Sequence, residues 1–342
     1  MYIIRRKLSI AEAILLKFFT DNKKRIYILF ILTIIGIAVI FFTNKEKQPV
    51  SETRFMLDTV CTITLYEWNG DGERIVDEAF GLCGKYEKML SSTVSGSDIF
   101  AINHSDGKPV EVSQETAELL ERAKRYCKLS GGAFDITIYP VKELWDFSGE
   151  SASLPDQDSL SEAADLVDYT KISISGTTVT LPDGMGIDLG AIAKGYIADR
   201  AADYLRQQGV TSAIIDLGGN IFTIGKKSDG QLWRVGIRMP FEEGEADVVE
   251  TSDSSVVTSG VYQRYFKKDG VLYHHILRSS DGMPCDTGLY SVTVISGCSE
   301  QCDALSTVCM LLGYEKSKTL LSGIKGIRAV FITSDNQLLY YN

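Results

Sequence analysis

The sequence predicts an α+β domain, and three observations lead to that fold class. Segments whose apolar residues recur at helical spacing are mixed, in no regular order, with segments in which apolar and polar residues alternate as in strands. Short glycine-containing turns separate several strand-like segments, which favours antiparallel hairpins. No repeat, low-complexity tract or proline-rich linker divides residues 53–342. We therefore expect one domain of two packed lobes, built from mixed or antiparallel sheets and helices.

An apolar segment precedes this domain. Residues 26–43 carry no charge and are just long enough to cross a bilayer as a helix, which takes about 17–25 residues. Basic residues cluster before this segment, so a basic cytoplasmic segment is expected at 1–25, a single transmembrane anchor at 26–43 and a polar linker at 44–52. The domain at 53–342 would then lie outside the plasma membrane. A cleaved signal peptide is the alternative, although no A-x-A-like site follows the apolar run.

Charge excludes one class of partner. The first 50 residues hold nine of the 35 basic residues and three of the 45 acidic ones. The rest of the chain therefore has 26 basic and 42 acidic residues. Such an acidic body repels nucleic acid, so no nucleic-acid partner is expected.

The seven cysteines favour burial over a metal or disulfide framework. Their odd number leaves at least one unpaired. Cys298 and Cys302 are one residue further apart than in the common C-x-x-C zinc motif, and no histidine follows them. Buried small side chains are the expected role.

The spacing of apolar residues along the chain predicts where the helices and strands lie. Alternation predicts strands, in chain order, at residues 61–68, 171–184 (a hairpin), 213–225 (strand, turn, strand) and 231–240, and around 255–261, 271–277 and 290–295. Helical spacing predicts helices at residues 74–90, 116–132, within 186–205 and through 302–313. Polar stretches at 148–161 and 241–252 are expected to be loops, and a pair of short strands closes the chain.

The stretch at 186–205 predicts a phosphate site. Asp188 is followed by a run of glycine and alanine, then by Lys194 at the start of a helical segment. Small residues at a helix start let backbone N–H groups approach an anion, and a lysine adds counter-charge. Neither of the standard phosphate-loop patterns is present.

A second stretch predicts a metal site. Asp303 and Thr307 are four residues apart, so they share one face of the expected helix. A carboxylate and a hydroxyl together suit Mg²⁺, which takes oxygen ligands. The alternative is an ordinary helix start in which Asp303 or Ser299 serves as a cap.

Two weaker candidates remain. Ala133, Phe134 and Asp135 directly follow a helix, and an aromatic ring at that place could lie against a planar ligand; a C-cap followed by a core phenylalanine is the alternative. His274 and His275 are neighbours in a strand, so only one of them can face a given pocket. A histidine near phosphate could act as a base.

These segments occur in the same order as in a known family. The sequence resembles the ApbE family of FAD:protein FMN transferases over about residues 53–342. The most specific pieces are "DLGAIAKGY" at 188–196 and "DALST" at 303–307. The resemblance implies an ApbE-type catalytic domain that, with Mg²⁺, moves the FMN half of FAD onto a Thr or Ser hydroxyl and releases AMP.

The resemblance also implies roles for individual residues. The metal ligands would be Asp303, Thr307 and the backbone carbonyl of Ala191, with Glu300 as a weaker candidate. His275 and Asp303 would be catalytic, His275 as the base. The residues that would contact FAD are Met56, Thr93, Ala133, Phe134, Asp135, Asp188, Lys194, His274 and His275.

The acceptor implied by the family is an exported FMN-binding protein with a D-x-x-[ST]-G-A-[ST]-like motif, of which this chain has no convincing copy. Arg278 and Ser279 stand where the family usually has Asp-Pro, and Val261 and Gln263 occupy two usually acidic positions. These departures bear on acceptor choice. Two other functions stay open: an FAD pyrophosphatase that yields FMN and AMP, and a flavin carrier that binds FAD without turnover.

Overall fold

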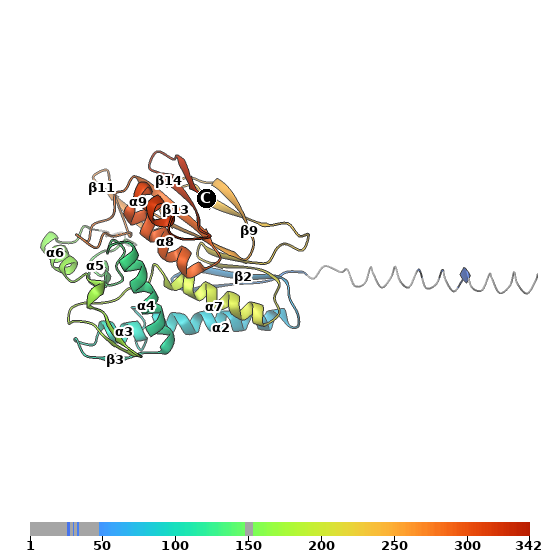
Figure 1. Ribbon diagram of the computed structural model, residues 1–342, viewed down its shortest axis with the longest axis horizontal. Helices are drawn as coiled ribbons and strands as arrows, with labels where there is room; N and C mark the ends of the chain where they lie inside the picture. Colours follow the sequence, from blue (N-terminus) through green and yellow to red (C-terminus); the bar gives the residue numbers. More distant parts are fainter. Residues whose placement is uncertain (1–25, 28–29, 31–32, 34–47, 148–152) are drawn as a thin grey trace, which may run out of the picture. The chain divides into compact units, whose positions relative to one another are not determined.

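The computed structural model divides the chain into two units, 1–48 and Pro49–Asn342, and the second unit contains both segments that carry the predicted site (Figure 1). The structure describes residues 26–27, 30, 33, 48–147 and 153–342. The expected cytoplasmic segment at 1–25 and most of the expected anchor at 26–43 lie outside these described residues. No helix among the described residues is long and apolar enough to cross a membrane.

The central element is an eight-stranded sheet in which every paired neighbour is antiparallel. Its strands, in spatial order, are β1 (Val50–Met56), β2 (Thr59–Glu67), β6 (Ser212–Leu217), β7 (Asn220–Ile224), β10 (Ser254–Gly260), β13 (Leu289–Ser296), β14 (Arg328–Thr333) and β15 (Leu338–Tyr341). This arrangement confirms the α+β class with antiparallel sheets. Strand β1 begins at Val50, inside the segment at 44–52 that the composition predicts as a linker.

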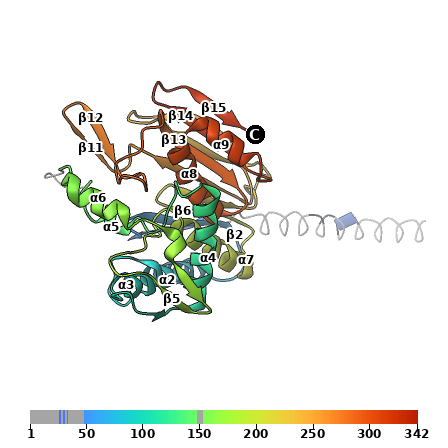
Figure 2. The same ribbon diagram turned by 60° about the vertical axis from the view of Figure 1, so that its left-hand side comes forward.

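Helices cover one face of this sheet. Helix α2 packs on β1 and β2, α7 on β6 and β7, and α8 on β10 and β13, while α7 also contacts both other helices (Figures 1 and 2). The helices of the described residues are α2 (Gly72–Leu90), α3 (Asp98–Asn103), α4 (Gln114–Leu129), α5 (Tyr139–Lys142), α6 (Gln157–Asp165), η1 (Tyr169–Lys171), α7 (Ala193–Gln207), α8 (Ser299–Leu312) and α9 (Tyr314–Leu321).

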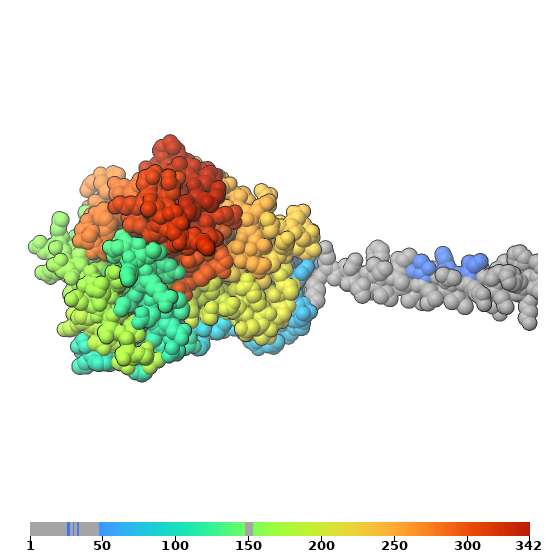
Figure 3. Space-filling model, viewed as in Figure 1, coloured from blue at the N-terminus to red at the C-terminus, as the bar shows by residue number. Residues whose placement is uncertain are grey.

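A hairpin of β8 (Trp233–Arg238) and β9 (Glu245–Thr251) packs on the other face. Successive residues of β10 show how the sheet is filled from both sides, because Val256 joins the cluster with the hairpin and Val257 joins the one with α8. The space-filling view shows the outer surface of the second unit from the same side as Figure 1 (Figure 3).

Two loop predictions were wrong over part of their length. Strand β9 occupies most of 241–252, because it pairs with β8 along its length and buries Val249 and Thr251 despite the acidic composition. Helix α6 begins at Gln157, inside the expected loop at 148–161, and Asp156 caps it by accepting from the Ser159 N–H at 3.0 Å.

Smaller sheets lie at the periphery. The predicted hairpin at 171–184 is present as β4 (Ser173–Ser175) and β5 (Thr178–Thr180), joined by β3 (Val110–Glu111). A separate ribbon of β11 (Tyr265–Lys268) and β12 (Val271–His274) packs its aromatic side chains with those near α5 and α6. Six of the seven cysteines are buried, as expected, and only Cys298 is exposed.

Candidate active site

Asp188 organises the turn that leads into α7. Its Oδ1 accepts a hydrogen bond from the Gly190 N–H at 2.9 Å, and its Oδ2 lies 2.5 Å from the Lys142 ammonium and 3.4 Å from the Ser92 hydroxyl. Burial alone would raise the pKa of Asp188, but Lys142 and these hydrogen bonds lower it overall. The carboxylate is therefore charged, and its contacts shape the turn.

Lys194 is a cation in the first turn of α7. Its side chain is half-buried, and it forms no ion pair with any residue of 48–147 or 153–342. Its charge opposes the burial effect that raises the pKa of Asp303, and it contributes to lowering the pKa of His275, so these three groups lie near one another. A lysine without an anionic partner at a helix N-terminus is suited to binding a phosphate.

Helices α7 and α8 cap each other. Asp303 of α8 accepts from the Gly195 N–H of α7 at 2.9 Å, and Asp199 of α7 accepts from the Ser299 N–H of α8 at 2.8 Å. A Cβ at Gly195 would lie 2.3 Å from the Ser299 carbonyl oxygen, so only glycine permits this approach. We call α7 and α8 the cross-capped helix pair.

Three candidate oxygen donors for a cation lie on α8 or just before α7. The second carboxylate oxygen of Asp303, Oδ1, accepts no hydrogen bond from the described residues. Thr307 follows one turn later, with its hydroxyl 3.0 Å from that of Ser259, and Ala191 is half-buried just before α7. A carboxylate, a hydroxyl and a carbonyl are the ligand types that Mg²⁺ prefers, so the residues present fit the predicted ion.

The two histidines have different environments. His274 is 4% exposed, and both ring nitrogens are engaged, Nε2 with the Cys285 carbonyl at 3.0 Å and Nδ1 with the Ile276 N–H at 3.3 Å. His275 is half-buried, and only its Nδ1 has a partner among the described residues, the Arg264 carbonyl at 3.3 Å. Burial lowers the pKa of His274 to about 4 and that of His275 to about 3. His275 is therefore a neutral imidazole whose Nε2 is open to a ligand.

Comparison with known proteins adds independent information. The model of the ApbE family matches residues 57–331. The chain is 38% identical to a FAD:protein FMN transferase of Treponema pallidum, over 86% of this chain and 87% of that one, and 38% identical to one of Klebsiella pneumoniae, over 86% and 92%.

The chain belongs to the ApbE family. It is therefore an enzyme, a transferase. Solved structures agree in fold: the ApbE protein of Thermotoga maritima has a TM-score of 0.79 and 30% identity over 85% of this chain and 96% of that one. The flavin transferase ApbE of Vibrio cholerae has a TM-score of 0.78 and 27% identity over 86% and 96%.

In this ApbE-family chain, the side chains of two residues in the segment 133–135, which follows α4, fix its conformation. Asp135 accepts from the Thr137 N–H at 2.8 Å and from the Tyr169 N–H at 2.9 Å, and Phe134 is buried in the main core. Ala133 is half-buried. Any contact of this segment with flavin would therefore come from the backbone and Ala133, because the other two side chains already have structural roles.

Glu300, the weaker metal candidate, already has a cationic partner. Its carboxylate lies 2.8 Å from Nε of Arg122 on α4 and is almost fully buried. The described residues contain no group of three or more His, Cys, Asp or Glu side chains able to hold a metal. The predicted ligand set has only two carboxylates, Asp303 and Glu300, and its other donors are a hydroxyl and a backbone carbonyl.

Met56 and Thr93 lie in two further loops. Met56 ends β1, where its carbonyl accepts from the Cys61 thiol at 3.5 Å. Thr93 is exposed and bonds to Ser91, and the intervening Ser92 reaches Asp188. The loop of Thr93 is thus tied to the predicted phosphate turn, whereas Met56 packs against the core beside α2, where its methyl group would lie 3.7 Å from a Cβ at Gly84.

Sequence reasoning missed three residues with ionisable side chains that contact the predicted site residues or their helix α8, namely Lys142, Asp199 and Arg122. Each has a partner on another element, so no local spacing pointed to it. Helical spacing places Asp199 four residues after Gly195, but it does not place Asp199 against α8.

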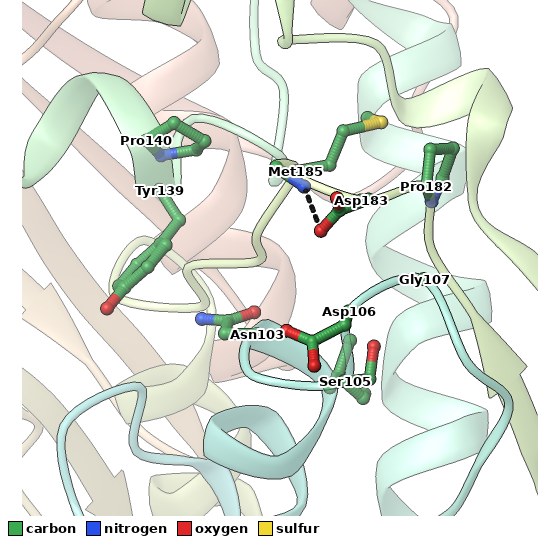
Figure 4. A pocket seen from close by; sticks show the side chains of 11 residues that line it. Asn103, Ser105, Asp106, Gly107, Tyr139, Pro140, Pro182, Asp183 and Met185 are labelled. Atoms are coloured by element: carbon green, nitrogen blue, oxygen red, sulfur yellow. Dashed lines mark hydrogen bonds between the residues drawn. The ribbon is translucent and has the colours of Figure 1, made fainter.

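A surface cavity of 190 Å³ is lined in part by Asp183, Gly184 and Met185, which shortly precede the turn at Asp188. Asn103 contributes to its wall and also fixes Ile187, donating to its carbonyl at 2.9 Å and accepting from its N–H at 2.6 Å. Figure 4 shows Asn103, Asp106, Tyr139 and Met185 around this cavity. None of the predicted site residues lines it.

Proposed function

We propose that this chain is a FAD:protein FMN transferase that uses Mg²⁺. The observation that supports this most directly is Lys194 in the first turn of α7, which forms no ion pair among the described residues and lies near enough to Asp303 to oppose the rise in the pKa of that carboxyl. One oxygen of Asp303 accepts no hydrogen bond from the described residues. This arrangement suits a diphosphate that bridges a cation and a lysine. The named relatives, which are FAD:protein FMN transferases, provide the substrate class.

In the proposed reaction, an acceptor Ser or Thr hydroxyl oxygen bonds to the phosphorus of the FMN half. The bond from that phosphorus to the bridging oxygen breaks, and AMP leaves with the electron pair. Lys194 binds a diphosphate oxygen and stabilises the charge that develops on it. Asp303, Thr307 and the Ala191 carbonyl would hold Mg²⁺, which supplies further neutralisation of that charge.

His275 is the proposed base. The Arg264 carbonyl can only accept a hydrogen bond, so Nδ1 carries the proton and the open Nε2 has the lone pair that takes the proton of the acceptor hydroxyl. His274 cannot take this role in the described structure, because both of its nitrogens are already engaged. We propose that His274 instead holds the strand that presents His275.

The test is a mass measurement on an acceptor. The protein is incubated with FAD, Mg²⁺ and an exported flavoprotein or peptide that carries a D-x-x-[ST]-G-A-[ST] segment. The expected products are an acceptor that carries covalent FMN and an equal amount of AMP. Free FMN with an unmodified acceptor would instead identify a pyrophosphatase, and intact FAD would identify a carrier.

We also propose that residues 26–43 anchor the enzyme in the plasma membrane, with the catalytic domain outside. The support is the uncharged run and the basic residues before it. Carbonate extraction should leave the full chain in the membrane fraction. External protease should degrade the domain in spheroplasts, and protection of the domain would contradict this orientation.

A further inference from the structure

Asp199 belongs to the cross-capped helix pair but to none of the predicted ligand sets. Its two oxygens accept from the first two N–H groups of α8, those of Ser299 at 2.8 Å and Glu300 at 2.9 Å. The N-cap residue of α8, Cys298, makes no side-chain capping bond. Asp199 therefore provides, from another helix, the cap that the sequence at the start of α8 lacks.

Helix α8 caps α7 in the same way that α7 caps α8. The N-cap residue of α7, Ile192, makes no side-chain capping bond, and Asp303 accepts from the Gly195 N–H instead. The contact at Gly195 brings the two helix backbones together. Two caps that run in opposite directions thus fix how far Asp303 and Thr307 lie from Lys194.

We propose that Asp199 is a positioning residue for the metal site. By capping α8, it holds the Asp303 carboxylate and the Thr307 hydroxyl in the place where they and Lys194 can act on one diphosphate. This inference rests on the proposed function, because it takes Asp303 and Thr307 to be ligands of a divalent cation. Residues that orient ligands typically change metal affinity by about 10- to 100-fold when they are replaced.

The negative charge of Asp199 offers a competing explanation, since any nearby carboxylate attracts a cation. Two substitutions separate charge from capping. Asp199→Asn removes the charge but keeps one oxygen that can accept from α8, whereas Asp199→Ala removes the charge and the cap together. Gly195→Ala forces the helices apart at the Ser299 carbonyl without changing any charge.

The experiment uses the full chain with FAD bound and Mn²⁺ as the probe, with free Mn²⁺ measured by electron paramagnetic resonance. Asp199→Ala should weaken Mn²⁺ binding by about 10- to 100-fold, and Asp199→Asn clearly less. Gly195→Ala should also weaken it. FAD binding without metal should change by less than about twofold in the Asn variant, because none of the described residues expected to contact FAD forms a hydrogen bond with Asp199.

Asp203→Asn is the matched control. Asp203 lies one turn further along α7, its side chain is 48% exposed, and it pairs only with Arg200 and Arg206 among the described residues. Its replacement should leave Mn²⁺ binding unchanged.

Equal losses of Mn²⁺ affinity in Asp199→Asn and Asp199→Ala would assign the effect to charge and overturn the inference, as would unchanged affinity in both. Thermal unfolding shows whether Asp199→Ala folds. If it does not, unchanged Mn²⁺ affinity in both Gly195→Ala and Asp199→Asn would overturn the inference.

Titration of the wild-type protein with Mn²⁺ distinguishes a failure of this inference from a failure of the proposed function. Wild-type protein that binds Mn²⁺ with FAD, together with unaffected Asp199 variants, rejects the positioning role alone. Wild-type protein that binds no Mn²⁺ rejects both the metal site and the role of Asp199.

Discussion

The Lys142 ammonium lies 2.5 Å from the Asp188 carboxylate, although 46 residues separate them in the chain. This pair joins α5 to the turn before α7, and its anion also accepts from the Gly190 N–H. The turn that carries Ala191 and Lys194 is therefore stabilised by an ion pair with Lys142, a residue that no local sequence motif indicated.

Lys142→Met should weaken FAD binding several-fold, because the turn that presents Lys194 loses one support. The loss of stability should be no more than about 1 kcal/mol, since the lysine side chain is 42% exposed and its ion pair is screened by water. FAD titration and urea unfolding measure the two effects. Lys318→Met, which removes an exposed pair with Glu315 on α9, is the control and should leave FAD affinity unchanged.

Asp303→Asn and Asp303→Ala should both lower FMN transfer by at least about 10²–10³, because each removes a charge that acts on the transferred phosphoryl group. Only the alanine variant should also lose about 1 kcal/mol of stability, since asparagine keeps an oxygen for the Gly195 N–H. Acceptor mass spectrometry and thermal unfolding separate these effects. Wild-type transfer by Asp303→Asn would rule out this metal ligand.

His275→Asn should lower transfer by about 10²–10³ while FAD affinity changes little, as expected for loss of a base. The pKa of about 3 means that wild-type kcat/KM should show no acid limb near pH 6.5 from this residue. A pH–rate series on both proteins is the measurement. An unchanged rate in the variant would exclude the base, and a wild-type limb near 6.5 would contradict the lowered pKa of the half-buried His275.

Stability should fall as the solution is acidified from pH 7 to pH 4. The pKa of His274 is about 4 in the folded protein and about 6.5 when unfolded, so the unfolded chain binds the proton first. This one group should contribute about 3 kcal/mol above pH 6.5, lost as the pH falls through 4. His275 acts in the same direction.

Urea midpoints measured at several pH values test this expectation. His274→Asn should reduce the pH dependence, while His104→Asn, at an exposed position, should retain it. An equal slope in wild-type and His274→Asn proteins would show that the burial of His274 carries no such linkage.

Much of the fold could be predicted because periodicity is a local property. The strands near 213–225 and 290–295 and the helices at 74–90 and 116–132 are present within a few residues of the expected ends. Strand β9 and helix α6 were not predicted, because the pairing of β9 with β8 and its packing on the central sheet, and the cap of α6 at Asp156, outweighed their polar composition.

The sequence by itself determined the fold class, the family and the two segments that carry Lys194 and Asp303, since each depends on residues close together in the chain. Only the tertiary structure decided which histidine has an open nitrogen, that Asp135 and Glu300 are already bound to protein groups, and that Asp199 and Lys142 support the site. The reason is physical. Charge and hydrogen-bond partners are set by distance in space, and helices α7 and α8 meet because β6, β7, β10 and β13, which lie between them in the chain, form part of the sheet on which both helices pack.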